Sequence, residues 1–556
     1  MRQSFFSFAF AAALGMVTAA PAMADGHEAP AQESEAPERG PPRLVVAIAV
    51  DQLSADLFAQ YRRYFTRGLW QMLDGAVFPS GYQSHAATET CPGHSTILTG
   101  VRPARNGIIA NWWFDPGIGR KDKKIYCAED ETDPASTSDN PVVSARHLKV
   151  PTLGDRLKAA NPQSRNVAVS AKDRSAVMMG GKSLDAAYWI SGSQFTSFAG
   201  TEPGKAATEI NLKIKERIEA GSAELEVPAF CAARERAVAV GSGSVGTWKF
   251  PVAAGQPRTF QASPLLDRAT AALALGLVDE FQLGQDAVPD VLSIGLAGTD
   301  IIGHAFGHQG LEMCLQLAQV DDTIGRLFAE LEERGIDFVT VLTADHGGID
   351  APERLAEQAY PGAQRIAPEL LTGALGKRMT EETGIKTEGS MLLGGVNGDL
   401  YLSAELSQDQ RRTVALALIA YLETHPQVAA VFHADELAAA PMPKGSPQDW
   451  TLLERARASF DEESSGDLVV ALKRGILPLP PIPGLVTTHG SIWDYDRRVP
   501  ILFWRKGLAG LEQPAPVETV DIAPTLAALL GLKVPQGEFD GRCLDIDGSA
   551  HDICAE

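Results

Sequence analysis

The sequence predicts an α/β fold, with a mostly parallel central sheet flanked by helices and with inserted subdomains. At 556 residues the chain can bury a large core. Short apolar runs alternate with helical patterns, and each run leads to a charged residue. Continuous apolar runs of this length are typical of strands buried on both faces, as in parallel sheets covered by helices. The runs are 44–50 before Asp51, 166–171 before Lys172, 290–298 before Asp300 and 338–344 before Asp345.

The charged residues after these four runs indicate a shared site. In an open parallel sheet, ligands bind beyond the carboxyl ends of the strands. A single Asp after a strand is equally well explained as a helix N-cap. Four such positions together favour a common ligand. We therefore expect Asp51, Lys172, Asp300 and Asp345 to meet at one edge of the sheet.

The start of the chain has the pattern of a secretory signal peptide over residues 1–24. Arg2 precedes an apolar stretch from Phe5 to Ala20, and the small residues Ala22 and Ala24 flank Met23. This pattern predicts cleavage after Ala24 and a periplasmic or secreted protein. A retained membrane anchor is the alternative, but the stretch is short for a bilayer, which needs about 20 residues.

The rest of the chain is expected to form one catalytic domain behind a short linker. Residues 25–42 are rich in Pro and Glu and predict a flexible linker. The domain then covers 43–556, with insertions near 175–285 and 351–484 that we expect to cap the site. The second insertion shows a strand-helix-strand pattern. We expect a monomer with no stable membrane insertion.

The charge of the chain excludes some partners. The net charge is -21, and it becomes -22 without Arg2, the one charged residue of the predicted signal peptide. A surface this acidic repels polyanions, so we expect no nucleic-acid-binding surface. Any phosphate group must therefore be bound by a local cluster of cations.

The six cysteines are expected to form disulfides. Their number is even, they contain no C-x-x-C pair, and an exported protein meets oxidising conditions. This pattern disfavours zinc-thiolate ligation. The first pair that we expect is a local bridge between Cys543 and Cys554. The second is a bridge between Cys91 and Cys127.

Six Asp and His residues predict a catalytic metal centre. Asp300 and His304 are four residues apart, so on a helix they share a face, and His308 continues that spacing. Two Zn²⁺ ions with three protein ligands each would leave positions for a nucleophile, a water and a substrate oxygen. Mg²⁺ or Ca²⁺ would need more oxygen donors. The six candidates are Asp51, Asp300, His304, Asp345, His346 and His489.

The chain resembles the alkaline phosphatase superfamily, and within it the single-chain exported bacterial alkaline phosphatases of the PhoK type. The resemblance covers nearly all of the chain after residue 24, and it implies an alkaline-phosphatase-like fold. Its motifs follow in the family's order: "VDQLSAD", "TETCPGHSTILTG", "NWWFD", "AKDR", "DIIGHAFGH", "TADHGG", "THGS" and "VETVDIAPTLAALLGL".

The resemblance also implies a role for each site residue. Thr90 would be the nucleophile and would form a phosphothreonine intermediate. The phosphoryl oxygens would be bound by Asn111, Lys172 and Arg174. One zinc ion would be bound by Asp300, His304 and His489, and the other by Asp51, Asp345, His346 and the Thr90 oxygen.

The remaining polar candidates have ordinary structural explanations. We expect His94 to orient its loop, and Trp112 and Trp113 to be core residues unless one of them walls the pocket. His308 could support a ligand from behind. Hydroxyls satisfied within their own turn or helix are expected at Thr88, Ser95, Thr96 and Thr99. Positions at the surface or behind the ligands are expected for His85, His147, His425, His433 and His551.

The predicted function is hydrolysis of small-molecule phosphate monoesters, and it has three alternatives. A sulfatase shares the fold but needs a C-x-P-x-R tract, which the residues after Cys91 do not provide. A phosphodiesterase or nucleotide pyrophosphatase would use the same Thr and two zinc ions. Lys172 and Arg174 favour a monoester, because they place two positive charges where a diester carries an organic group. A noncatalytic periplasmic binder of phosphate or zinc would not need Thr90.

Overall fold

The central sheet of the protein is built around β1 (Leu44–Val50), a strand whose seven residues are all buried. The computed structural model describes residues 40–548 and 552–554. The other strands of this sheet are β2 (Ala76–Tyr82), β5 (Asn166–Ser170), β6 (Ala186–Ser191), β7 (Gln194–Thr196), β10 (Asp290–Leu296), β11 (Phe338–Thr343), β18 (Arg498–Arg505), β19 (Leu511–Glu512) and β20 (Val517–Glu518). Their order is β19-β2-β18-β11-β1-β10-β5-β6-β7, and β20 pairs with β2.

The middle of this sheet is parallel, as predicted. Strands β11, β1, β10, β5 and β6 all run in the same direction, and Ile48 of β1 lies between Ile294 of β10 and Leu342 of β11. Towards the edges, β18 is antiparallel to β11 and to β2, and β7 is antiparallel to β6. The predicted α/β class is therefore confirmed, with antiparallel strands added at both sides.

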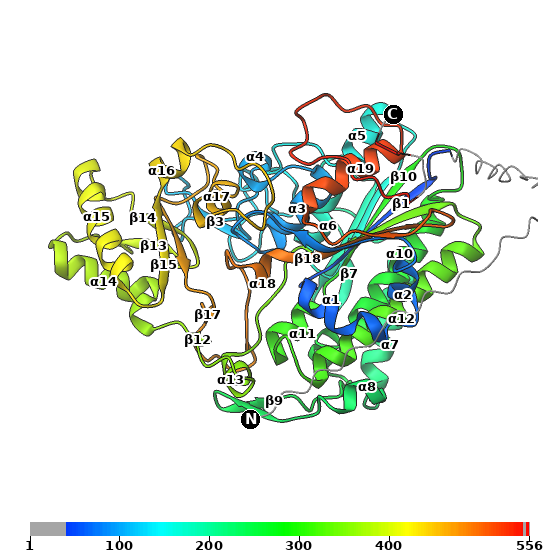
Figure 1. Ribbon diagram of the computed structural model, residues 1–556, viewed down its shortest axis with the longest axis horizontal. Helices are drawn as coiled ribbons and strands as arrows, with labels where there is room; N and C mark the ends of the chain where they lie inside the picture. The colour runs from blue at the N-terminus through cyan, green and yellow to red at the C-terminus, as the bar shows by residue number, and fades with distance from the viewer. Residues whose placement is uncertain (1–39, 549–551, 555–556) are drawn as a thin grey trace, which may run out of the picture. The chain divides into compact units, whose positions relative to one another are not determined.

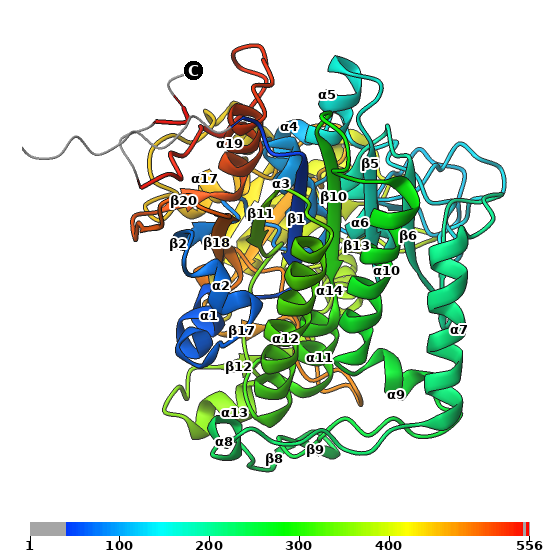
Figure 2. The ribbon, with the colours of Figure 1, turned by 90° about the vertical axis from the view of Figure 1, so that its right-hand side faces the viewer.

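Helices cover both faces of the central sheet (Figures 1 and 2). Val46 and Ile48 point into a core shared with α7 (Lys205–Ala220), α10 (Leu265–Phe281) and α12 (Leu311–Glu333). Val45 and Ala47 point into a second core with α3 (Thr90–Thr99), α5 (Leu153–Ala160) and α19 (Ile522–Leu529). Full burial of an aliphatic side chain stabilises the fold by about 1.5 to 3 kcal/mol. This double burial explains why β1 lacks alternating polar residues.

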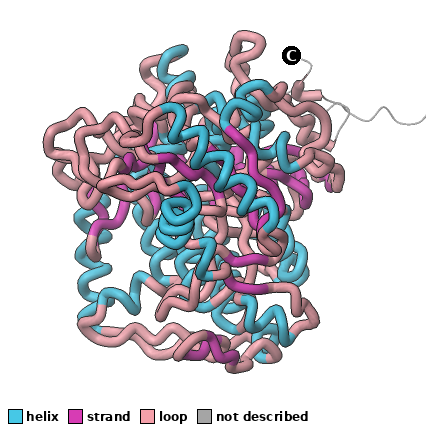
Figure 3. The backbone as a smooth tube through the Cα atoms, turned by 90° about the vertical axis from the view of Figure 1, so that its left-hand side faces the viewer, coloured by secondary structure: helices cyan, strands magenta, loops and turns pink. Residues whose placement is uncertain are grey.

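A smaller antiparallel sheet forms within residues 351–484 (Figures 1 and 3). It consists of β13 (Leu392–Gly394), β14 (Gly398–Leu402), β16 (Leu468–Leu472) and β15 (Val428–His433), in that order. Helices α14 (Thr372–Thr383) and α15 (Gln408–Thr424) pack on it, and they share a core with the sheet. The predicted strand-helix-strand pattern is confirmed as β14, α15 and β15.

Residues 175–285 differ in part from the expected insertion. They contribute β6 and β7 to the central sheet and α7 and α10 to its cover. The β6 segment, "AAYWIS", is short and mixed in polarity, and so it lacks the long apolar run that marks the inner strands. That either stretch caps the site stays a prediction.

The remaining elements are short connections around these layers. They are α1 (Ala55–Tyr61), α2 (Gly68–Met72), α4 (Pro103–Asn106), β3 (Trp112–Phe114), β4 (Lys124–Tyr126), α6 (Asp173–Gly180), α8 (Ala229–Ala232), β8 (Val238–Val240), β9 (Gly243–Val245), α9 (Pro257–Gln261), α11 (Gly298–Phe306), α13 (Pro352–Glu357), β12 (Gln364–Arg365), α16 (Ala434–Ala439), α17 (Leu452–Arg457), β17 (Ile476–Leu477) and α18 (Asp494–Arg497).

All six cysteines are paired, so the disulfide prediction is confirmed. The bridges are Cys91–Cys127, Cys231–Cys314 and Cys543–Cys554. None of the helices in the described ranges combines the length and the apolar character needed to cross a membrane. The predicted signal peptide, most of the predicted linker and His551 lie outside the described residues.

Candidate active site

The carboxyl ends of the parallel strands bring the predicted charged residues together. Asp51 directly follows β1, and Lys172 lies two residues after the end of β5. The Lys172 ammonium lies 2.6 Å from Asp51 Oδ2 and 2.6 Å from Asp300 Oδ2. Asp345 lies two residues after the end of β11. The His346 ring lies between Asp345 and Asp51: its Nε2 is 3.5 Å from Asp51 Oδ1 and 3.4 Å from Asp345 Oδ2. The expected shared edge is confirmed.

Helix α11 places Asp300 and His304 on one face, as their spacing predicts. His304 Nε2 lies 3.2 Å from Asp300 Oδ1, and His489 Nε2 lies 3.5 Å from the same oxygen. The helix ends at Phe306, because Gly307 adopts a φ of 94°. His308 therefore does not continue the helical spacing with His304, and the sequence expectation on this point is wrong.

Three histidines are oriented by backbone carbonyls. The Nδ1 atoms of His304, His346 and His489 lie 2.8, 2.8 and 2.9 Å from the carbonyl oxygens of Thr487, Gly347 and Thr88. A neutral imidazole that donates from Nδ1 presents the lone pair of Nε2, and this arrangement is typical of metal-binding histidines. All three Nε2 atoms face the carboxylates described above.

Unpaired buried atoms in this cluster fit a metal ion. Asp51 Oδ1 and His346 Nε2 are buried and have no hydrogen-bond partner among the described residues. Buried polar atoms are normally paired or bound to a metal. A mixed set of carboxylate oxygens and imidazole nitrogens suits Zn²⁺ better than Mg²⁺ or Ca²⁺.

The ligand atoms form two compact groups that overlap the predicted ones. Asp300, His346 and His489 make one group, and Asp51, His94 and Asp345 make the other; within each group the ligand atoms lie within 4.8 Å of one another. His94 was not predicted as a ligand. Its Nδ1 lies 2.9 Å from the Thr90 carbonyl oxygen and 3.1 Å from Asp345 Oδ2, which also fits its predicted role in orienting the loop.

The electrostatics of the cluster also favour bound cations. Burial raises the pKa of Asp51, and the carboxylates of Asp345 and Asp300 raise it further against the opposing effect of Lys172. Burial opposes ionisation of Asp345 as well, but His346 and His94 outweigh it and lower its pKa. Lys172 offsets one of the three negative charges of Asp51, Asp300 and Asp345, so further positive charge would stabilise their ionised forms.

Thr90 begins helix α3 next to these groups. Its side chain is buried, and its Oγ1 lies 3.4 Å from Lys172 Nζ. A Cβ atom on Gly93 would lie 2.0 Å from the Asp345 carbonyl oxygen. Glycine at position 93 therefore allows the first turn of α3 to contact the loop that carries Asp345 and His346.

Asn111 and Arg174 lie around the same helix terminus. Asn111 Oδ1 accepts a hydrogen bond of 2.8 Å from the N–H of Cys91, and the Asn111 N–H donates one of 2.7 Å to Glu89 Oε2. This leaves Asn111 Nδ2 as a donor for a ligand. Arg174 lies in the first turn of α6, and its Nε is buried without a hydrogen-bond partner among residues 40–548 and 552–554.

The remaining sequence candidates have mostly the expected positions. The hydroxyls of Ser95, Thr96 and Thr99 donate to carbonyls three or four residues earlier in α3, as expected. Thr88 instead donates to the carbonyl oxygen of Ser491, 403 residues away, so the expected local bond at Thr88 is wrong. Trp113 is buried, whereas Trp112 is 38% exposed and packs against Tyr126, so Trp112 is not a core residue. His85 is fully buried, and His425 is nearly so. His147 and His433 are half-buried or near the surface.

Gln52 also contacts this cluster, and the sequence did not predict it. It follows Asp51 directly and is fully buried. Its Nε2 donates a hydrogen bond of 2.9 Å to Asp300 Oδ1, and its N–H donates one of 3.0 Å to Asp345 Oδ1. Its position beside a predicted ligand was the available signal, but an isolated glutamine after an aspartate has no distinctive spacing.

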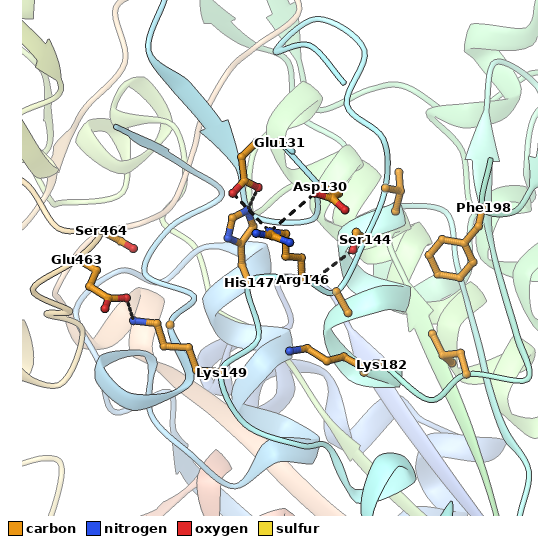
Figure 4. Close-up of a pocket in the computed structure, with 15 residues that line it drawn as sticks. Asp130, Glu131, Ser144, Arg146, His147, Lys149, Lys182, Phe198, Glu463 and Ser464 are labelled. Carbon is orange, nitrogen blue, oxygen red and sulfur yellow. Dashed lines mark hydrogen bonds and ion pairs between the residues drawn. The ribbon is translucent and has the colours of Figure 1, made fainter. Parts of the chain in front are cut away.

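A separate cavity of about 780 Å³ contains none of the predicted site residues (Figure 4). Its charged side chains largely pair with one another. His147 Nε2 lies 3.0 Å from Glu131, and Lys149 Nζ lies 2.7 Å from Glu463. Arg146 lies 3.5 Å from Glu131. Because positive and negative groups offset one another here, this cavity has no clear preference for an anion.

The fold and the site together define an enzyme of the alkaline phosphatase superfamily. The structure matches the crystal structure of alkaline phosphatase PafA with a TM-score of 0.79 and 26% sequence identity, over 92% of this chain and 100% of that chain. Residues 45–488 match the family described as type I phosphodiesterase / nucleotide pyrophosphatase. The chain belongs to this family.

Two curated relatives are similar over most of their length. Alkaline phosphatase PhoK from Sphingomonas sp is 49% identical over 519 residues, which is 93% of both chains. Alkaline phosphatase PhoD from Zymomonas mobilis is 45% identical over 519 residues, which is 92% of this chain and 89% of the relative. These similarities confirm the family resemblance found in the sequence.

Proposed function

We propose that this enzyme is an exported alkaline phosphatase that hydrolyses phosphate monoesters at a two-zinc site. The observation that carries the proposal is the cluster of three buried carboxylates and three oriented histidines beside Thr90 and Lys172. The relatives named alkaline phosphatase support the same activity.

The residues divide between two metal positions and one phosphate position. Asp300, His304 and His489 would hold one zinc ion, and Asp51, Asp345, His346 and Thr90 Oγ1 would hold the other. When bound, the two ions would lower the pKa of the Thr90 hydroxyl and offset charge on the attacking and leaving oxygens. Asn111, Lys172 and Arg174 would bind the remaining phosphoryl oxygens.

Thr90 is the proposed nucleophile. Its Oγ1 loses its proton to solvent and attacks phosphorus; a Thr90 O–P bond forms, the bond from phosphorus to the leaving oxygen breaks, and that oxygen takes up a proton from solvent. Water then attacks the phosphothreonine, which breaks the Thr90 O–P bond, returns a proton to Thr90 Oγ1 and releases inorganic phosphate.

The cations around Thr90 support a monoester substrate. A monoester carries up to two negative charges on its phosphoryl oxygens, and Lys172 and Arg174 can each offset one of them. A diester carries one negative charge and replaces one phosphoryl oxygen with an ester group. The family name keeps a phosphodiesterase or nucleotide pyrophosphatase as the second candidate.

The proposal is tested by comparing p-nitrophenyl phosphate with bis-p-nitrophenyl phosphate as substrates of the zinc-loaded enzyme. We expect the monoester to have the higher kcat/KM. Lys172→Gln should lower monoester turnover more than diester turnover, whereas Lys182→Gln, at an exposed position, should change neither. Faster turnover of the diester would support a phosphodiesterase, and no turnover of either would support a noncatalytic binder.

We also propose export with cleavage after Ala24. The three disulfides support an oxidising compartment. N-terminal sequencing of the protein recovered from the periplasm or the medium should begin at Asp25. A chain that keeps Met1 and remains with the membranes would support the retained anchor instead.

A further inference from the structure

Gln52 connects the two proposed metal positions through three hydrogen bonds. Its side-chain Nε2 donates to Asp300 Oδ1 at 2.9 Å, and its backbone N–H donates to Asp345 Oδ1 at 3.0 Å. Its carbonyl oxygen accepts from His308 Nε2 at 3.0 Å. Asp300 and Asp345 belong to different metal positions, so one residue contacts a ligand of each.

The backbone of Gln52 is held in an unusual conformation. Its φ is 67°, in the left-handed region that residues other than glycine rarely adopt. Such a conformation persists where the surroundings determine it, and it is common at functional sites. Here it turns the N–H towards Asp345 while the side chain reaches Asp300.

Two glycines leave room for the Gln52 side chain. A Cβ atom at Gly303 would lie 1.9 Å from Gln52 Oε1, and one at Gly348 would lie 3.2 Å from Gln52 Cδ. Gly303 lies between Asp300 and His304 on α11, and Gly348 lies two residues after His346. The ligand-bearing segments therefore enclose the Gln52 amide closely.

The position of His308, which donates to the Gln52 carbonyl, is fixed by hydrogen bonds that involve Asp350 and Arg354. The backbone N–H of His308 donates to Asp350 Oδ1 at 2.9 Å, and Arg354 donates to the same oxygen at 2.6 Å. Arg354 also donates to the carbonyl oxygens of Gln309 and Phe306. These bonds hold residues 306–310, and so they hold the ring that donates to the Gln52 carbonyl.

We infer that Gln52 is a positioning residue that fixes Asp300 and Asp345 for metal binding, and that His308 supports it. The inference rests on the proposed two-metal site. Bonds from Gln52 restrict the rotation of both carboxylates. The two side chains therefore lose less conformational entropy when a metal ion binds. Partners behind metal ligands typically contribute about 10- to 100-fold in metal affinity or activity.

The test compares zinc affinity in the wild type and in Gln52→Gly, by competition with a chromogenic chelator. Glycine accepts the left-handed φ and removes the amide, so the main chain should keep its place. We expect zinc affinity to fall about 10- to 100-fold. Turnover should fall at limiting zinc and recover largely at saturating zinc, which a general folding defect would not do.

Two further variants sharpen the test. His308→Leu should weaken zinc binding in the same direction but less, because the Gln52 amide is kept. Gln71→Ala removes an exposed glutamine that donates to Glu332 away from the site, and it should leave zinc affinity unchanged. Circular dichroism of each metal-free variant should match that of the wild type.

The outcomes separate this inference from the proposed function. If the wild type holds zinc and Gln52→Gly holds it equally tightly, the inference is overturned and the two-zinc phosphatase stands. If the wild type holds no zinc, the proposed metal site fails and the inference fails with it. Loss of zinc affinity in Gln52→Gly, with an unchanged control, supports both.

Discussion

The backbone N–H of Cys91 donates a hydrogen bond of 2.8 Å to Asn111 Oδ1. Cys91 follows the proposed nucleophile Thr90, and Asn111 is a proposed phosphate-binding residue. The bond therefore fixes the Asn111 amide relative to Thr90 and directs Nδ2, the donating group, away from Cys91. The disulfide between Cys91 and Cys127, together with the bond from the Cys127 N–H to the Asn111 carbonyl, links the same two segments through Cys127.

Asn111→Asp should test the role of the Asn111 amide as a donor. The substitution keeps an oxygen for the Cys91 N–H and replaces Nδ2 with a second oxygen, which repels a phosphoryl oxygen. Loss of one such donor typically costs about 100- to 1000-fold in rate. We expect kcat/KM for p-nitrophenyl phosphate to fall by that amount with little change in melting temperature. Unchanged kcat/KM would contradict the role.

The Cys91–Cys127 bridge should matter for turnover as well as stability. The double variant Cys91→Ser/Cys127→Ser should lose about 2 to 4 kcal/mol of unfolding free energy. It should also lose turnover, because the Thr90 and Asn111 segments are no longer joined. The matched control is Cys543→Ser/Cys554→Ser, which opens a bridge of sequence separation 11 away from these residues. Equal losses of turnover in the two variants would contradict a specific role.

Removal of metal should destabilise the folded protein. Without bound cations the buried carboxylates of Asp51, Asp300 and Asp345 are incompletely neutralised, and a ligand that binds the folded state stabilises it. Treatment with a strong chelator should lower the melting temperature and abolish turnover. Zinc added back should restore both, measured by calorimetry and by hydrolysis of p-nitrophenyl phosphate. Restoration by Mg²⁺ alone would argue against a zinc site.

Asp496 should make the stability of the folded protein depend on pH. Burial raises its pKa from 3.8 to about 7, against the opposing hydrogen bonds from Ser491. The folded state therefore binds more protons than the unfolded state between these values. Stability falls as pH rises through this range, by up to about 1.4 kcal/mol per pH unit.

The variant Asp496→Asn should remove this dependence. Its Oδ1 can still accept from the Ser491 N–H, and it carries no charge. Urea unfolding of the chelated protein should show a wild type that is less stable at about pH 8 than at about pH 5, and a variant with a smaller difference. If the free energy of unfolding depended equally on pH in the two proteins, the pKa of Asp496 would not be raised in the folded state.

The parallel layer could be predicted from the sequence because its strands are buried on both faces. Such strands are continuous apolar runs, and β1 and β11 begin and end close to the predicted positions. Strand β6 was not predicted because it lies towards the edge and is short and mixed in polarity. The i, i+4 spacing of Asp300 and His304 predicts their shared helix face, whereas Gly307, with its positive φ, ends the helix before His308.

The partners of the candidate ligands could not be predicted in the same way. Gln52 contacts Asp300 across 248 residues, and His489 contacts the Thr88 carbonyl across 401 residues. Such contacts depend on how distant segments fold together, and local spacing does not encode them. The assignment of Thr90 as nucleophile came from family resemblance, and it remains a prediction.

The most direct test of the central proposal is a search for the covalent intermediate on Thr90. The zinc-loaded enzyme is mixed with a phosphate monoester, quenched in acid during turnover, digested and mapped by mass spectrometry. We expect one phosphoryl group on Thr90, and none in Thr90→Ala, whose turnover should fall by more than about a thousandfold. Full turnover by Thr90→Ala, or a phosphoryl group on a different residue, would contradict the account.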